Sequence, residues 1–208
     1  LLTQPFPPPV HRKPPVLCQG GTVHFHSLTQ LHKTILPPPS NPCLQFLDSN
    51  GYKILALKSE PPNCGHYILK GYNSTHLLNL LQNSFSLNNG HYPTGSVTDI
   101  IIQIGSLNFH FTSLHQANSI LSKTIQVLTK AFPIAHIYFL PPTIPPQADA
   151  TQKTSIRYWR TALNQHILSH NITLLPQVVG SRHLPFLHPS SHSNNLRYIA
   201  KSPHTHYK

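Results

Sequence analysis

The apolar run from Asp99 to Ile104 (DIIIQI) constrains the fold more than any other segment of this chain. It is rich in isoleucine, too short for an ordinary helix, and ended by Gly105. Such a run is typical of a strand that is buried on both faces of a parallel sheet. Because parallel neighbours need crossover connections, which are usually helices, the run predicts an α/β fold.

The segment after this strand predicts the clearest helix. Its apolar residues recur every three or four positions and so share one helical face. They are Leu114, Ala117, Leu121, Ile125, Leu128 and Phe132. Ser113 is an N-cap candidate, and Pro133 ends the pattern. A second helix is expected over residues 150–170, with Trp159 on its apolar face.

Shorter segments complete the alternation of strands and helices. Strands are predicted at residues 16–18, 66–69, 137–140 and 172–175, and helices at residues 27–33 and from about Ser74. Residues 44–47 and 52–57 flank the turn signal Asp48-Ser49-Asn50-Gly51 and are expected to form a β-hairpin. The whole pattern predicts a three-layer, flavodoxin-like sandwich with a parallel sheet of roughly five strands and helices on both faces.

The length of 208 residues fits a single domain. Residues 1–15 are rich in proline and are expected to be an extended lead-in. The domain is predicted over residues 16–200, and residues 201–208 form a tail.

Acidic residues are scarce. Only Asp48, Glu60, Asp99 and Asp149 carry a carboxylate side chain, and the formal net charge is +11. A basic balance favours polyanionic partners such as nucleic acid, but the 15 Lys and Arg residues are scattered singly apart from Arg12-Lys13. A solvated basic surface and a nucleic-acid patch both stay open. A coding strand poor in G would also produce this composition.

The cysteines indicate a reducing compartment. Cys18, Cys43 and Cys64 form no CxxC pair and no even framework. No signal peptide is visible, and no apolar run approaches the ~20 residues of a membrane span. We therefore expect an intracellular protein. Because the chain begins with leucine, we also expect a fragment or a piece of a polyprotein.

Four blocks of sequence, taken in order, resemble the SGNH (GDSL-type) hydrolases. The blocks are RKPPVLCQGGT, LKGYNSTHLLNLLQ, TDIIIQIGSLNF and AFPIAHIYFLPP. They look closest to the SGNH-like domains that animal retroelements encode. The resemblance implies an esterase fold with a nucleophilic serine in Gly-Asp-Ser after the first strand. It also implies a glycine after the second strand, Gly-x-Asn after the third, and Asp-x-x-His near the C-terminus.

Several positions depart from that family pattern. Gly20-Gly21-Thr22 stands where the family has Gly-Asp-Ser, so Thr22 is the candidate nucleophile. Gly71 matches the second-block glycine, whose N–H would point into an oxyanion hole. In the third block the asparagine position falls on Leu107, or on Asn108 if the turn is one residue longer.

The C-terminal block departs furthest. His192 is the candidate base, but Pro189 stands where the family has aspartate, and no acid follows Asp149. His183, His188 and His192 sit at spacings of five and four, and His24 and His26 alternate along an extended segment. Tracts rich in histidine can bind Zn²⁺ or Cu²⁺. The cysteine and carboxylate companions of a metal site are missing, so neither a metal nor a cofactor is expected.

These departures predict a degenerate, non-catalytic SGNH-like domain of a retroelement or viral polyprotein, with a structural or interaction role. The first alternative is a weak esterase that acts on acyl or acetyl esters. It would use Thr22 and His192, with Gly71 and Asn108 at the oxyanion. The second alternative is a basic domain that binds nucleic acid or other polyprotein domains. A translated pseudogene without a selected task also stays open.

Overall fold

The computed structural model describes residues 22–48, 64–85, 96–142, 144–166 and 171–174, without the side chains of Thr22, Val23 and Phe25. The strands are β1 (Thr22–Ser27), β2 (Cys43–Leu47), β3 (Cys64–Lys70), β4 (Asp99–Gln103), β5 (His136–Phe139) and β6 (Ile172–Leu174). The helices are η1, a 3-10 helix (Leu28–Lys33), α2 (Ser74–Phe85), α3 (Leu114–Ala131) and α4 (Ala150–His166).

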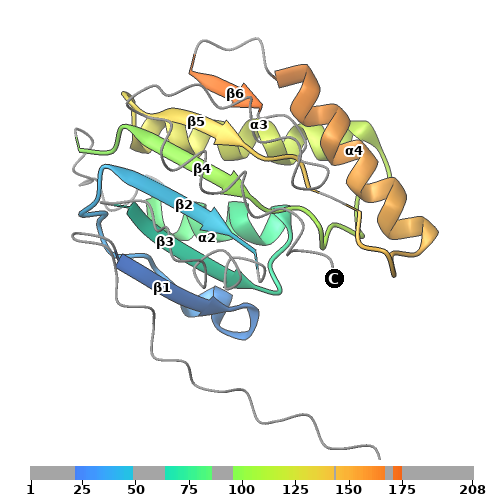
Figure 1. Ribbon diagram of the computed structural model, residues 1–208, viewed down its shortest axis with the longest axis horizontal. Helices are drawn as coiled ribbons and strands as arrows, with labels where there is room; N and C mark the ends of the chain where they lie inside the picture. Colours follow the sequence, from blue (N-terminus) through green and yellow to red (C-terminus); the bar gives the residue numbers. More distant parts are fainter. Residues whose placement is uncertain (1–21, 49–63, 86–95, 143, 167–170, 175–208) are drawn as a thin grey trace, which may run out of the picture.

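The six strands form one parallel sheet in the order β1-β3-β2-β4-β5-β6 (Figure 1). The order places β2 between β3 and β4, although β3 follows β2 in the chain. All five residues of β2 and all five of β4 are buried, so the centre of the sheet is covered on both faces. The predicted α/β class with a parallel sheet is therefore confirmed, with six strands in place of roughly five.

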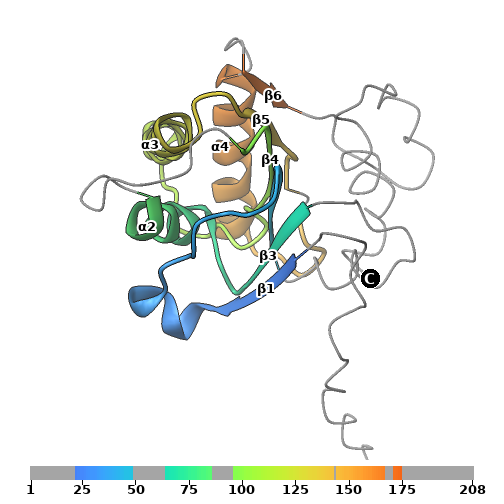
Figure 2. The same cartoon turned by 90° about the vertical axis from the view of Figure 1, so that its left-hand side faces the viewer.

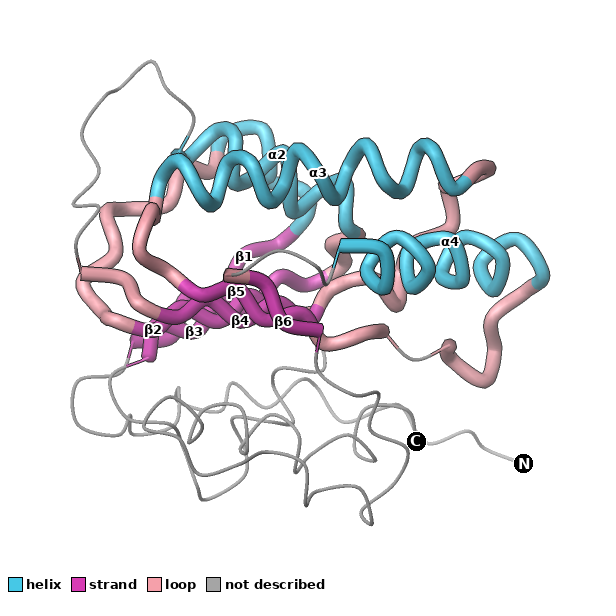
Figure 3. The backbone as a smooth tube through the Cα atoms, turned by 90° about the horizontal axis from the view of Figure 1, so that it is seen from above, coloured by secondary structure: helices cyan, strands magenta, loops and turns pink. Residues whose placement is uncertain are grey.

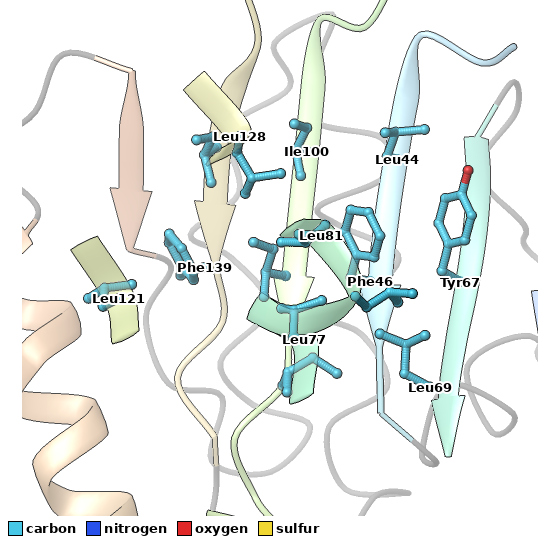
Figure 4. Packing of buried hydrophobic residues seen from close by; sticks show 14 of the residues in the cluster. Leu44, Phe46, Tyr67, Leu69, Leu77, Leu81, Ile100, Leu121, Leu128 and Phe139 are labelled. Atoms are coloured by element: carbon cyan, nitrogen blue, oxygen red, sulfur yellow. The ribbon is translucent and has the colours of Figure 1, made fainter. Parts of the chain in front are cut away.

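The main core lies between one face of the sheet and the helices. Leu44, Phe46, Ile100 and Ile102 point to this face because they alternate along β2 and β4, which pair in register. The helices contribute apolar side chains at helical spacing (Figure 4). From α2 and α3 these include Leu77, Leu81, Leu121 and Leu128. Figure 2 shows α2 and α3 on the same side of the sheet, and Figure 3 shows α4 there as well.

The helix ends follow the sequence signals. The Ser113 hydroxyl caps α3 and accepts a hydrogen bond of 3.2 Å from the backbone N–H of Gln116. Helix α3 ends at Ala131, two residues before Pro133. Trp159 is 2 % exposed and packs in the core, as its place on the apolar face of α4 predicts.

One expectation needs correction. Strand β2 has a parallel neighbour on each side, so it has no free edge for a hairpin partner. The partner strand predicted at residues 52–57 lies outside the described residues. The helices that the structure describes all cover one face of the sheet (Figure 3). The strand predicted at residues 16–18 lies outside the described residues.

Candidate functional site

The carboxyl ends of β3, β2 and β4 meet at one edge of the sheet, because parallel strands all end there. Gly71 follows β3, Asp48 follows β2 and Gly105 comes two residues after β4. The sheet order places Asp48 between the other two. In open parallel sheets, ligands bind outside this edge. The edge is therefore the candidate site of the molecule.

Asp48 is an acidic residue at this edge. Its side chain is 2 % exposed, and its carboxylate accepts a hydrogen bond of 3.0 Å from the Ser106 hydroxyl. Its backbone N–H donates to the carbonyl of Gln103 at 3.1 Å and so continues the pairing of β2 with β4. Asp48, which was expected to open a hairpin turn, is thus a buried carboxylate at the end of a central strand. Ser49, the next residue in the chain, lies outside the described residues.

The turn after β4 is held from two sides. On one side the Gln152 side chain of α4 donates to the Ser106 carbonyl at 2.7 Å. On the other side the Asn108 carbonyl oxygen accepts from the Ser74 backbone N–H at 2.9 Å, and its amide donates to the Ser74 hydroxyl at 2.9 Å. These contacts fix the turn rigidly between α2 and α4.

Asn108 was expected to hold the oxyanion of an ester intermediate. Its side chain is instead fully buried, and both of its polar atoms bind Ser74 at the start of α2. Leu107, at the other possible position, has no side-chain donor to offer. The asparagine of this block therefore holds the start of α2 in place through its hydrogen bonds to Ser74.

Gly71 stands in a tight turn with φ of +81°, a conformation that favours glycine. The turn is closed by a hydrogen bond of 3.3 Å from the Tyr72 N–H to the Leu69 carbonyl. This places Gly71 at the carboxyl edge, as expected. Its role as an oxyanion donor stays a prediction.

Thr22 lies at the opposite end of the sheet. It is the first residue of β1 and pairs with Gly65, whereas Gly71 comes six positions after Gly65 and directly follows Lys70, the partner of Ser27. Six residues of extended chain span about 20 Å. A nucleophile and an oxyanion donor must meet at one carbonyl group, so Thr22 cannot act together with Gly71. The error arose because β1 begins at Thr22, whereas the sequence interpretation assumed that a strand ended before it. His192 lies outside the described residues.

A polar cluster at the start of α2 contains residues that the sequence pattern did not predict. The Asn73 side-chain oxygen accepts from the His76 backbone N–H at 2.9 Å, and the Asn73 N–H donates to Nδ1 of His76 at 3.1 Å. The Asn73 amide nitrogen lies 3.4 Å from Nδ1 of His110. Nε2 of His110 lies 2.6 Å from the Thr75 hydroxyl. This pair forms a capping box, in which the N-cap residue and the residue three positions later exchange hydrogen bonds. The pattern is recognisable in a sequence, although here a histidine takes the usual place of Glu or Gln.

This cluster determines how His110 is protonated. Because the Asn73 oxygen is fixed by its bond to the helix, the Asn73 amide nitrogen must donate to Nδ1 of His110. In that tautomer Nε2 of His110 carries the hydrogen and donates a hydrogen bond to the Thr75 hydroxyl. The arrangement resembles a nucleophile and its base, but His110 in this state cannot accept a proton from Thr75.

Burial lowers the pKa of His76, and burial together with the nearby His76 lowers the pKa of His110. A lowered pKa favours the neutral form of both imidazoles. Among the described residues, no group of three or more His, Cys, Asp or Glu side chains is placed to hold a metal ion. In the same part of the chain, no helix is long and apolar enough to cross a membrane.

Comparisons with known proteins add a likeness of fold. No family model matches the chain, and no curated protein matches it. A solved structure from Streptococcus pneumonia, described as a candidate platelet activating factor, has a TM-score of 0.52 and 16% identity, over 86% of this chain and 88% of that one. A carbohydrate esterase family 2 enzyme with a carbohydrate-binding domain, from Corynascus thermopiles, has a TM-score of 0.44 and 12% identity, over 83% of this chain and 67% of that one.

The first of these likenesses shows a shared fold. It is consistent with the SGNH-hydrolase-like fold that the sequence blocks predict. The retroelement relationship stays a prediction.

Proposed function

We propose that the carboxyl edge of the sheet is an ester-hydrolysing site in which Ser49, and not Thr22, supplies the attacking hydroxyl. The observation that carries this proposal is the position of Asp48, buried at the end of the central strand β2. Asp48-Ser49 thus follows β2 in the sequence, and β2 lies between the strands that Gly71 and Gly105 follow. In the SGNH pattern, the Asp-Ser of Gly-Asp-Ser precedes these two glycine blocks in the same order.

The chemistry of this proposal needs three parts. The serine hydroxyl attacks the carbonyl carbon of an acyl or acetyl ester, and a base takes its proton. Backbone N–H groups stabilise the oxyanion that forms, and we assign one of them to Gly71. His192 is kept as the proposed base on the sequence evidence alone. Ser106, bonded to Asp48, would hold the carboxylate and the turn in place.

A second candidate function is a non-catalytic interaction domain. The observation that favours it is the side chain of Asn108, which is committed to Ser74 while Leu107 offers no side-chain donor. Loss of one oxyanion donor typically lowers kcat on the order of 10²–10³-fold. A site with a backbone donor alone would be slow, and the fold could then serve only to present a surface.

The two functions are distinguished by measuring the hydrolysis of p-nitrophenyl acetate. Three purified proteins are compared: the wild-type chain, Ser49→Ala and Thr22→Ala. We expect Ser49→Ala to lose at least about 100-fold in rate, because the nucleophile is removed, and Thr22→Ala to keep the wild-type rate. Circular dichroism should show that all three proteins are folded.

The other outcomes also distinguish between the two functions. Loss of activity in Thr22→Ala alone would return the nucleophile to Thr22 and overturn the proposal. A folded wild-type chain that hydrolyses the ester no faster than Ser49→Ala would favour the interaction domain.

A further inference from the structure

Cys43 and Cys64 occupy matching positions in the sheet. Cys43 is the first residue of β2 and Cys64 the first residue of β3, and the two pair in register across neighbouring parallel strands. Side chains of directly paired residues point to the same face of a sheet. The two thiols therefore lie next to each other at the amino end of the sheet, far from the carboxyl edge.

The geometry brings the sulfur atoms together. The Cys64 thiol donates a hydrogen bond to Sγ of Cys43 over 2.8 Å. A disulfide bond is about 2.05 Å long, so the sulfurs lie less than about 1 Å beyond bonding distance. Neighbouring strands are about 4.8 Å apart, within the Cα separation of roughly 4.4–6.8 Å that disulfides span. Little backbone movement is needed to join them.

We propose that Cys43 and Cys64 are a disulfide-forming pair that closes the segment between β2 and β3 covalently when the chain folds with a disulfide oxidant. In this exchange the two thiols lose two protons and two electrons, and one S–S bond forms between them. The oxidant, oxidised glutathione for example, gains them as its own S–S bond breaks and two glutathione thiols are released. This site is independent of the proposed ester chemistry.

Burial determines when the reaction occurs. Cys43 is 5% exposed and Cys64 is 0% exposed, so an oxidant has little access to either thiol in the folded chain. Burial, and secondly the hydrogen bond to Cys43, raises the pKa of Cys64, which disfavours the thiolate that must attack. In the unfolded chain both thiols meet solvent. The redox state of the pair is therefore set during folding and then kept.

The position of the pair predicts the effect of the bond. The disulfide would close residues 44–63 into a loop, and this loop includes Asp48 and Ser49. Closing a loop of this length stabilises a fold mainly by restricting the unfolded chain. The bond would lie at the amino end of β2, whereas Asp48 lies at the carboxyl end. We therefore expect higher stability and an unchanged carboxyl edge.

The test uses Cys18→Ser, which leaves only the two cysteines in question. The variant is unfolded, then refolded with oxidised glutathione, and its intact mass is measured. We expect the loss of two hydrogens with no glutathione attached, and a Tm roughly 5–10 °C above that of the reduced protein. Cys18→Ser/Cys43→Ser is the matched control, for which neither change is expected.

Two results would overturn the proposal. One is a refolded protein that carries glutathione on the thiols, or keeps both thiols reduced, under conditions that oxidise small dithiols. The other is an internal disulfide that lowers Tm, since the pair would then be a packing contact that oxidation strains. If Cys18→Ser does not fold, peptide mapping of the wild-type chain without reductant detects the same linked peptides.

Discussion

Gly105 shows how closely the backbone approaches its neighbours at the carboxyl edge. Its φ is +138°, a backbone conformation that residues with a side chain rarely adopt. A Cβ atom added there would lie 2.9 Å from Cγ of Pro142 and 3.0 Å from Cδ1 of Trp159. Both neighbours are ring atoms with little freedom to move. The glycine thus lets α4 and the loop after β5 pack against the turn that follows β4.

We predict that Gly105→Ala destabilises the protein by about 2–4 kcal/mol, because it combines backbone strain with overpacking. Gly71→Ala is the matched control. At Gly71 φ is +81°, but the nearest atom to an added Cβ is Cβ of Leu28 at 3.6 Å, so only the conformational cost of about 1 kcal/mol applies. Urea unfolding measures both changes, and equal losses at the two positions would refute the packing argument.

At the scale of single elements, the start of α2 depends on neutral histidines. This helix has no acidic residue in its first turn, and Asn73 and His76 exchange hydrogen bonds there. His110 joins the same group from the turn after β4 through Asn73 and Thr75. Protonation of Nδ1 on either imidazole would remove an acceptor that the helix start uses.

This predicts a loss of stability in mild acid. In the unfolded chain each histidine has a pKa near 6.5, and in the folded chain the pKa values of His76 and His110 are lower. Below pH 6.5 the unfolded chain therefore binds protons that the folded chain does not. The stabilisation is complete above pH 6.5 and is lost as the pH falls through the folded pKa values.

The measurement is the urea unfolding free energy between pH 7.5 and pH 5. We expect a shallower fall with pH for His76→Gln/His110→Gln than for the wild-type chain, because glutamine does not titrate. His115→Gln, on the exposed side of α3, is the control and should keep the wild-type slope. A double variant with an unchanged slope would show that other groups cause the acid sensitivity.

At the scale of the whole molecule, the net charge of +11 is the property that the fold leaves unexplained. A parallel α/β sheet does not require it. A polyanionic partner such as nucleic acid would explain the charge. Binding to such a partner releases counterions from the nucleic acid backbone. A nucleic-acid-binding role is therefore tested by the salt dependence of binding.

We predict that any binding of single-stranded oligonucleotides weakens by at least about tenfold between 50 and 200 mM salt. Fluorescence anisotropy with a labelled oligonucleotide measures this change. An uncharged oligomer with the same bases is the control and should bind with no salt dependence. Affinity for the charged strand that is flat with salt would argue against an electrostatic partner and leave the basic surface as a solvated one.

The type and order of most elements could be predicted from the sequence. The apolar run at Asp99 predicted β4, and the spacing from Leu114 to Phe132 predicted α3 with its cap and its end. These signals are local, because a helical period or a buried run is complete within its own residues. The predicted strands at residues 66–69 and 99–104 also placed Gly71 and Gly105 at the carboxyl edge.

Only the tertiary structure decided which strand is central. The pairing of β2 with both β3 and β4 depends on contacts between segments far apart in the chain, and no local pattern encodes them. That pairing turned Asp48 from a predicted hairpin residue into the buried carboxylate of the candidate site. The pairing of β1 with β3 placed Thr22 at the opposite edge, and the pairing of β2 with β3 brought Cys43 into register with Cys64. The sequence by itself thus determined the elements and their class, whereas side chains meet across a sheet only through strand order and register.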